Sequence, residues 1–347
     1  MKQVSYKSLL LVLISLALVS CKFKEGARME TITGKSNEVV VVIGKEIWKG
    51  EVGSLIREIL AQPQTSLPQE EPIFSLIDVP PEAFINLFKS SRNIVTVKIS
   101  PTYTEPKVEF ARNTWAYPQV VVNIQASSAE NFKELFIANG DKIIGYFLKA
   151  EKDRLKKTYK DSHEKAIYNA LLEEFNLQLY IPHGFKMVKK DSSFAWVRYD
   201  TPLITQNLFV YTYPYESDST FTQKYLIGKR NLVLKNNVPG PMPGSYMTTA
   251  MDLPRDINYV TYGGNYACEV RGLWRVENDF MGGPFVSLSV LDPDKKRVIT
   301  VEGNVYAPKN DKRNYVRQME AMIYSLEFPG QHQKADDSVK AQANSEK

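Results

Sequence analysis

Histidine and cysteine are scarce in this chain, which has three His and two Cys among its 347 residues. Because zinc sites draw most of their ligands from these two residue types, the shortage argues against a zinc site. The spacings of the common metalloprotease, serine-hydrolase and nucleotide-binding motifs are also absent from the sequence. We therefore expect no metal and no cofactor, and no residue stands out as catalytic.

The chain also lacks a large excess of either positive or negative charge. The chain has 44 Lys and Arg against 39 Asp and Glu, and the two signs are mixed along its length. Nucleic-acid-binding proteins usually carry a basic stripe or patch, so we expect no nucleic acid as a partner. Hydrophobic residues make up 43% of the chain. That fraction is enough for a buried core, and the length suggests two domains or one large one.

The N-terminus holds the most informative apolar run. Lys2 and Lys7 precede an apolar stretch from Leu9 to Val19, which only Ser15 interrupts. A basic head before about 7–15 apolar residues is typical of a secretory signal, whereas a membrane span needs ~20 apolar residues. The sequence therefore predicts export from the cytoplasm.

A cysteine follows this apolar run directly. The letters Leu-Val-Ser-Cys at 18–21 resemble the lipobox of bacterial lipoproteins. The resemblance implies cleavage before Cys21 and attachment of lipid, palmitate included, to that residue. Residues 1–20 are then a lipoprotein signal peptide, and the polar residues 21–36 are a tether. The alternative is an ordinary secretory signal with an incidental cysteine.

Cys268 is the second cysteine. If Cys21 carries lipid, Cys268 has no partner for an intramolecular disulfide. It lies in a strand-like stretch, so we interpret it as a small buried residue. A catalytic nucleophile is the alternative.

Apolar periodicity predicts an α+β fold with two lobes of antiparallel sheet packed with helices. The N-terminal lobe spans 37–176 and the C-terminal lobe 177–328, and the apolar-poor residues 329–347 form a disordered tail. Strands are expected at 38–43, 73–79, 94–99, 107–112, 119–124, 194–199, 208–215, 257–262, 266–276, 285–291 and 297–306. Helices are expected at 52–60, 128–139, 141–159, 163–175, 219–234 and 310–325, and a further one starts at Pro80 with Phe84, Leu87 and Phe88 inward.

Two similar segments raise the hypothesis of an internal repeat. Arg112-Asn-Thr-Trp115 and Arg271-Gly-Leu-Trp274 each precede a strand and later a helix. A true repeat would make the two lobes related units joined near residues 160–180.

The densest unusual segment runs from Arg271 to Phe285 and contains a Gly-Gly-Pro turn. We predict a ligand or partner site at a hairpin tip, with Trp274 as a platform and Arg271 as an anion clamp. Glu277 and Asp279 place opposite charge beside them. The alternative is a twisted hairpin whose turn is locked by an Arg–Asp pair, because structural ion pairs mimic sites.

A row of aromatic residues shares one strand face at period two, namely Phe209, Tyr211, Tyr213 and Tyr215. Because tyrosine rows can bind sugar rings or peptides, Tyr211 and Tyr213 are candidate binding residues. A core-facing strip with hydroxyls that reach solvent is the alternative.

Methionines lie beside the turn-rich loop 239–244. Met242, Tyr246 and Met247 could form an adaptable apolar rim there. A lid over a cleft and plain packing of the loop both remain open.

Several segments together resemble an uncharacterised lipoprotein family of Bacteroidota, classed as a domain of unknown function. They are the lipobox, the tether, 36–42, 48–52, 92–94 and 274–285. The resemblance implies origin and location but no site residues. Lipoproteins of such bacteria that are sent to the outer surface usually carry acidic residues just after the cysteine. Here Cys21 is followed by Lys-Phe-Lys-Glu, so we expect the protein to face the periplasm.

Residues 179–328 resemble PsbP-like domains more weakly. The segments that carry this resemblance are Ile181-Pro-His-Gly-Phe185, the run of antiparallel strands, and a last helix ending in 323–328. Such domains are mostly accessory or binding proteins, although a fold does not fix a function.

The sequence thus favours a membrane-anchored lipoprotein of the cell envelope that acts as a non-enzymatic binding or assembly factor. Its partners would be the membrane, through lipidated Cys21, and an envelope protein or small ligand. One rival is a periplasmic hydrolase that uses carboxylates such as Glu277 and Asp279. A purely structural spacer is the other.

Overall fold

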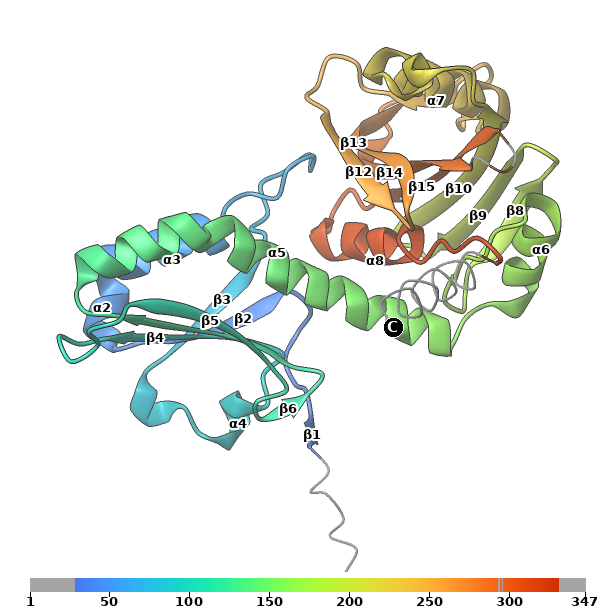
Figure 1. Ribbon diagram of the computed structural model, residues 1–347. Helices are drawn as coiled ribbons and strands as arrows, with labels where there is room; N and C mark the ends of the chain where they lie inside the picture. The colour runs from blue at the N-terminus through green and yellow to red at the C-terminus, as the bar shows by residue number, and fades with distance from the viewer. Residues whose placement is uncertain (1–28, 293, 295, 331–347) are drawn as a thin grey trace, which may run out of the picture.

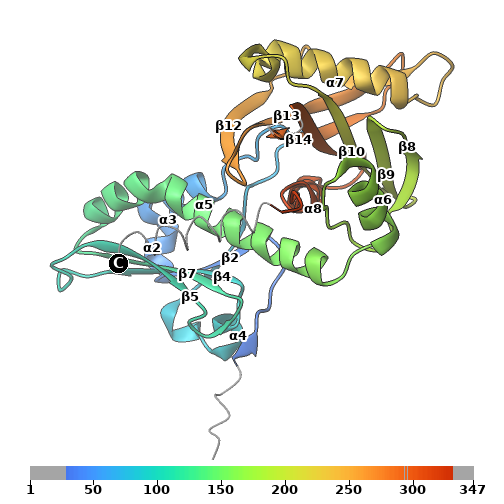
Figure 2. The same ribbon diagram turned by 45° about the vertical axis from the view of Figure 1, so that its right-hand side comes forward.

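A computed structural model describes residues 29–292, 294 and 296–330, which form two domains that mix helices and sheet (Figure 1; Figure 2). The expected α+β class is confirmed. The N-terminal domain spans 29–161 and the C-terminal domain 162–330. The predicted signal peptide, Cys21 and most of the predicted disordered tail lie outside the described residues.

The sheet of the N-terminal domain mixes strand directions. Its order is β3 (Ser75–Val79), β2 (Glu38–Val42), β4 (Asn93–Ile99), β7 (Val120–Ala126) and β5 (Lys107–Arg112). Three of the four pairings are parallel, and only β5 runs antiparallel to β7. The antiparallel sheet that we expected in both lobes is therefore found in the C-terminal domain, whereas in the N-terminal domain only the pairing of β5 with β7 is antiparallel. The four consecutive valines of β2, buried on both faces, suit a parallel sheet covered by helices on both sides.

Helices cover both faces of this sheet. On one face α3 (Glu51–Leu60), preceded by α2 (Lys45–Lys49), and the long α5 (Ala129–Asp161) enclose the larger core. On the other face η1 (Pro81–Ala83) and α4 (Asn86–Lys89) enclose a smaller one.

α5 is one helix of 33 residues. Ser128 caps it as expected, but the break expected at Asn139-Gly140 is wrong. Gly140 lies inside the helix, where it suits the close approach of α3, because a Cβ on Gly140 would lie 3.1 Å from Ile59 Cγ2. In the part of the chain that the structure describes, no helix has both the length and the apolar composition that crossing a membrane requires.

The first described residues belong to the N-terminal domain. β1 (Glu30–Thr31) pairs in parallel with β6 (Ala116–Tyr117), and the Thr33 amide donates to the Ser90 carbonyl at 2.8 Å. The polar tether that we expected to reach residue 36 therefore ends no later than Met29.

The C-terminal domain is built on one antiparallel sheet. Its order is β11 (Tyr246–Thr249), β13 (Asn265–Glu277), β14 (Gly282–Asp292), β15 (Arg297–Tyr306), β10 (Thr205–Pro214), β9 (Phe194–Asp200) and β8 (Lys186–Lys190), with β12 (Asp256–Tyr262) also on β13. β11 and β12 pair with opposite ends of the same edge of the long β13.

Each face of this sheet carries its own core. η2 (Asp218–Phe221) and α7 (Gln223–Asn237) cover one face, and α8 (Arg313–Ile323) and α6 (Lys165–Phe175) cover the other. We expected α6 in the N-terminal lobe, but its Ile167, Leu171 and Phe175 pack in the same core as α8. The domain boundary therefore follows α5, not residue 176.

The two domains do not repeat one topology. Arg112 ends a strand at the edge of the mixed sheet, and Trp115 packs edge-on against Phe84 in the smaller N-terminal core. Arg271 and Trp274 lie inside β13, between two antiparallel neighbours. The structure thus gives the hypothesis of an internal repeat no support.

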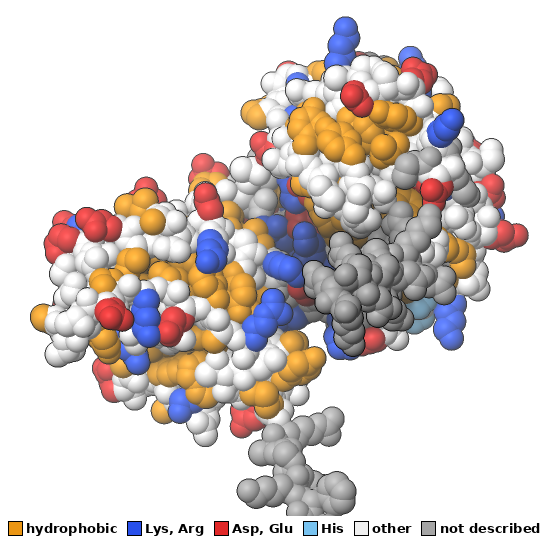
Figure 3. All heavy atoms as spheres, viewed as in Figure 1, with side chains coloured by type: hydrophobic (Ala, Val, Ile, Leu, Met, Phe, Trp, Pro, Cys, Tyr) orange, Lys and Arg blue, Asp and Glu red, His pale blue; other side chains and the backbone are white. Residues whose placement is uncertain are grey.

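The domains meet at α8. Glu71 of the N-terminal domain accepts hydrogen bonds from the amides of Lys312, at 2.7 Å, and Arg313, at 2.8 Å. The first amides of a helix have no acceptor within the helix, so this buried carboxylate caps α8 across the domain boundary. Arg313 in turn donates to the Pro72 carbonyl at 2.6 Å, and Lys and Arg side chains gather where the domains meet (Figure 3).

Candidate functional site

A pocket of about 280 Å³ opens at one end of the C-terminal sheet, where α7 ends. Strands β9, β13 and β15 supply three aromatic side chains to its wall, Trp196, Trp274 and Tyr306. Met247 and Met281 add thioethers, which adapt to irregular shapes. The pocket is therefore an aromatic and sulfur-lined opening into the core beneath α7.

Strand alternation explains how Trp274 reaches this wall. Trp274 and Val276 lie on the face of β13 that α7 covers, since successive side chains of a strand point to opposite faces. Gly283 lies opposite Trp274 on β14, and a Cβ there would be 3.2 Å from the indole Nε1. That nitrogen is buried and has no acceptor among the described residues, which is uncommon for a buried donor.

The loop 239–245 closes one side of the pocket. Ser245 Oγ donates to the Met242 carbonyl at 2.6 Å and accepts from the Met242 amide at 3.1 Å. Gly240 packs against the hairpin, because a Cβ there would lie 2.5 Å from Val276 Cγ1. These contacts hold the loop in place, so it is a fixed wall rather than a loose lid.

Exposed apolar side chains lie close in the sequence to residues that line the pocket. Phe280 is fully exposed next to Met281, Met242 is exposed next to Pro241, and Leu203 is exposed in the turn before β10. The Asp279 carboxylate accepts from the amides of Phe280 and Met281, which fixes the hairpin turn that presents the phenyl ring to solvent. We call Phe280, Met242 and Leu203 the apolar rim.

Polar groups are few in the pocket and mostly paired. Trp196 Nε1 donates to Asn207 Oδ1 at 2.9 Å, and Asn207 Nδ2 donates to Asn304 Oδ1 at 3.0 Å. Arg198 is the charged residue in the lining, and its guanidinium lies 3.1 Å from Asp200 Oδ2. The pocket thus offers an apolar interior with one cation beside it, which suits an apolar group.

A buried ion pair joins α7 to β15 in the core that the pocket opens into. Arg230 of α7 donates through Nε and Nη2 to the two carboxylate oxygens of Glu302 on β15, both at 2.8 Å. Its Nη1 donates to Thr249 Oγ1 at 2.7 Å, and its guanidinium lies 3.7 Å from the centroid of the Phe285 ring. Nothing in the local sequence around either charged residue indicated this pairing.

Arg271 lies on the opposite face of β13 from Trp274. Its Nε is 2.8 Å from Glu269 Oε1, and it also binds Glu320 of α8, which Arg317 contacts at 3.0 Å. The predicted site with Trp274 as platform and Arg271 as clamp is wrong in this arrangement, because residues three apart on a strand face opposite sides.

The predicted carboxylates do not line the pocket. Asp279 is occupied by the hairpin turn, and Glu277 lies half in solvent 3.9 Å from Arg275. Arg271 binds Glu269 and Glu320, so it does not form the Arg–Asp pair that we considered as a lock for this turn. In the described ranges, no group of three or more potential metal ligands comes together.

Tyr211 and Tyr213 are part of the core beneath α7. Burial raises the pKa of Tyr213 to about 12, and its hydroxyl lies 3.5 Å from Thr300 Oγ1. They face the core, as the alternative had it, but their hydroxyls are buried and do not reach solvent. Cys268 is buried in the same core, and burial raises the pKa of its thiol to about 11, so the thiolate is scarce near neutral pH.

Four residues of the pocket or the apolar rim were not predicted from the sequence, namely Trp196, Tyr306, Met281 and Phe280. Phe280 had a usable signal, since a large apolar residue is unusual in a hairpin turn, where Gly, Asn and Asp dominate. Trp196 and Tyr306 come from distant strands, and only the assembled sheet brings them to Trp274.

Comparisons with known proteins divide the chain in the same way as the structure. Residues 32–160 match the family described as a domain of unknown function, DUF8532, and residues 164–325 match another so described, DUF4837. The chain carries two domains of unknown function. No curated protein matches its sequence.

Three solved structures resemble part of the chain. The Ran-binding protein Mog1p of Saccharomyces cerevisiae is 8% identical over 44% of this chain and 90% of that chain, with a TM-score of 0.31. LpqN, involved in cell envelope biogenesis of Mycobacterium tuberculosis, is 15% identical over 43% and 81%, with a TM-score of 0.27. A protein from Bacteroides thetaiotaomicron VPI-5482 is 12% identical over 44% of this chain and 45% of that chain, with a TM-score of 0.23. Similarities of this size carry no argument about function, and the PsbP-like resemblance stays a prediction.

Proposed function

We propose that this protein is a periplasm-facing lipoprotein of the cell envelope, anchored through lipid on Cys21, that binds an apolar side chain of an envelope protein in its C-terminal pocket. The observation that carries the binding role is the pocket lined by Trp196, Trp274 and Tyr306, with Phe280 fully exposed next to the lining residue Met281. The signal-like N-terminus and the cysteine that follows it support the anchor.

Pocket size favours one side chain over a whole small molecule. Sites that enclose drug-sized ligands measure about 300–1,000 Å³, and this pocket is slightly smaller at about 280 Å³. Protein interfaces often concentrate their binding energy in one aromatic or aliphatic anchor that fills such a pocket. The apolar rim would then surround the anchor and exclude water from it.

The anchor is tested on protein purified from its own envelope. We expect an intact mass that corresponds to cleavage before Cys21 plus acyl chains, and we expect Cys21→Ser to remain uncleaved and without lipid. A mature protein of unlipidated mass would contradict the anchor and leave the binding role to be tested separately.

The binding role is tested by Met281→Trp, which narrows the pocket because Met281 is part of its lining. In crosslinked envelopes read by mass spectrometry, we expect one stoichiometric envelope protein to copurify with the wild type and to be lost from Met281→Trp. Val188→Trp is the matched control, because Val188 is exposed on the edge strand β8 of the same domain. Equal recovery with both variants would contradict binding in the pocket.

A further inference from the structure

The end of the N-terminal domain that carries α4 and β6 has its own set of exposed apolar side chains. Met29, Ile85, Leu87 and Tyr117 have exposed fractions of 41, 59, 68 and 51%. The expectation that Leu87 faces inward is wrong, because Phe84 and Phe88 fill the inner side of this short segment and turn Leu87 outward.

Hydrogen bonds bring these four residues to the same end. The Ile32 amide donates to the Tyr117 carbonyl at 3.2 Å, and the Thr33 amide donates to the Ser90 carbonyl at 2.8 Å. Ser90 directly follows α4, and its hydroxyl donates to the Leu87 carbonyl at 3.1 Å. β1, β6 and α4 therefore form one end of the domain, as Figure 1 shows.

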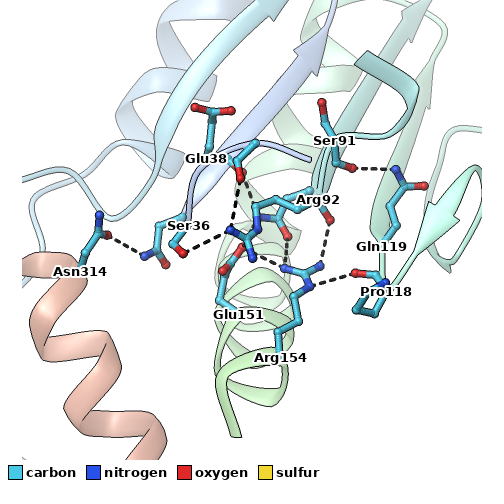
Figure 4. A network of polar contacts seen from close by, with 12 residues as sticks. Ser36, Glu38, Ser91, Arg92, Pro118, Gln119, Glu151, Arg154 and Asn314 are labelled. Atoms are coloured by element: carbon cyan, nitrogen blue, oxygen red, sulfur yellow. Dashed lines mark hydrogen bonds and ion pairs between the residues drawn. The ribbon is translucent and has the colours of Figure 1, made fainter. Parts of the chain in front are cut away.

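The segment that enters β2 from this end is held firmly. Glu151 of α5 lies 3.0 Å from Arg92 Nε and 2.9 Å from Arg154 Nη1 (Figure 4). Arg92 also donates to Ser36 Oγ at 3.2 Å, and Arg154 donates to the Pro118 carbonyl at 2.9 Å. This network fixes the chain after β1 to β4, α5 and the turn before β7.

Chain length then limits how far this end can be from a bilayer. Eight residue steps separate Cys21 from Met29, and a fully extended chain spans at most about 3.6 Å per residue, or about 29 Å here. A lipid on Cys21 would therefore keep β1 within that distance of the membrane surface.

We propose that the α4–β6 end, through Leu87, Ile85, Tyr117 and Met29, rests in the membrane interface. This proposal builds on the anchor at Cys21 that we propose above. An apolar surface held beside a bilayer gains by entering it, since burial of apolar area is favourable, and aromatic rings such as that of Tyr117 suit the interface. The opposite side of the sheet, covered by α5, carries Ile137 as its exposed aliphatic residue.

This orientation has a consequence for the pocket. In both ribbon views the C-terminal domain lies away from the end at which β1 begins (Figure 1; Figure 2). Resting on α4 and β6 therefore presents the C-terminal domain to the aqueous compartment, where an envelope partner can reach it.

The test uses the full lipoprotein with Leu87→Cys or Ile137→Cys, labelled with an environment-sensitive fluorophore and reconstituted into phosphatidylethanolamine–phosphatidylglycerol vesicles. Ile137, 64% exposed on α5, is the matched control. Cys268 is buried and should stay unlabelled. We expect spin-labelled lipid to quench the label at position 87 at least two-fold more than the label at 137.

The outcomes separate the two proposals. If the protein does not float with vesicles, the anchor fails. If it floats and both labels are quenched alike, the membrane contact is overturned while the anchor stands. If the label at position 87 is shielded from water but not quenched by lipid, and the protein is dimeric by light scattering, a second copy covers this surface and the proposal is equally overturned.

Discussion

Arg230→Met should lower the free energy of unfolding by about 3–5 kcal/mol, because it leaves the Glu302 carboxylate buried without its cation. Arg230 holds both oxygens of Glu302 and the hydroxyl of Thr249 at the centre of the core beneath α7. Urea unfolding followed by circular dichroism measures the loss. Since α7 ends at the pocket, the variant should also weaken partner capture.

Two further variants separate the effect of losing the ion pair from the effect of losing packing. Arg230→Met/Glu302→Leu removes both charges and should recover most of the lost stability, because apolar replacements of a buried pair are often neutral. Arg275→Met removes the partner of Asp252 in a largely exposed pair, and it should cost less than about 1 kcal/mol. A loss at Arg230 no larger than that at Arg275 would contradict the role assigned to the buried pair.

Acidification should destabilise the C-terminal domain between about pH 5 and pH 2 through Glu320. Burial by itself raises the pKa of this carboxyl, but the neighbouring Arg271 and Arg317 outweigh it and lower the pKa to about 2 from an ordinary value of 4.5. A native pKa below the unfolded one means that the carboxylate stabilises the fold above about pH 4.5. That contribution is lost as pH falls toward 2, and it is on the order of 3 kcal/mol.

Glu320→Gln isolates this contribution from that of other carboxylates. The variant should be less stable than the wild type at pH 7, and the difference between the two should shrink toward pH 2. Urea unfolding at a series of pH values gives both curves. Parallel curves for the two proteins would show that Glu320 does not titrate as the ion pairs with Arg271 and Arg317 require.

Local patterns predicted individual elements well. Period-two alternation and turn residues placed β5 at Lys107–Arg112 and the last strand at Arg297–Tyr306 with the observed bounds. Ser128 correctly marked the start of α5. Such signals depend on neighbours in the chain, so they are readable without the tertiary structure.

The predictions failed where packing between segments distant in the sequence determines the structure. Asn139-Gly140 is typical of a helix end, yet α5 continues through it, and the glycine instead suits the close approach of α3. The valine run of β2 indicated burial on both faces, but strand direction depends on the crossover connections, which an antiparallel expectation ignored. We placed Arg271 and Trp274 in one predicted site because they are close in the sequence, although their side chains point to opposite faces of β13.

The candidate site was only partly predictable, because five separate segments build it. Trp274 and Met247 were named from sequence, and the structure places both in the pocket wall. Trp196 and Tyr306 join them only through four successive strand pairings, β9 with β10, β10 with β15, β15 with β14 and β14 with β13. No local sequence pattern indicates how these strands pair.

Photo-crosslinking in intact cells from a photoreactive residue that replaces Phe280 tests directly whether the pocket binds an envelope protein. Tyr259, exposed on β12 of the same domain, is the control position. We predict one adduct of defined mass with an envelope protein from position 280, absent from position 259 and lost when Met281→Trp is added. No adduct at 280, or the same adducts from both positions, would contradict a binding pocket for an envelope partner.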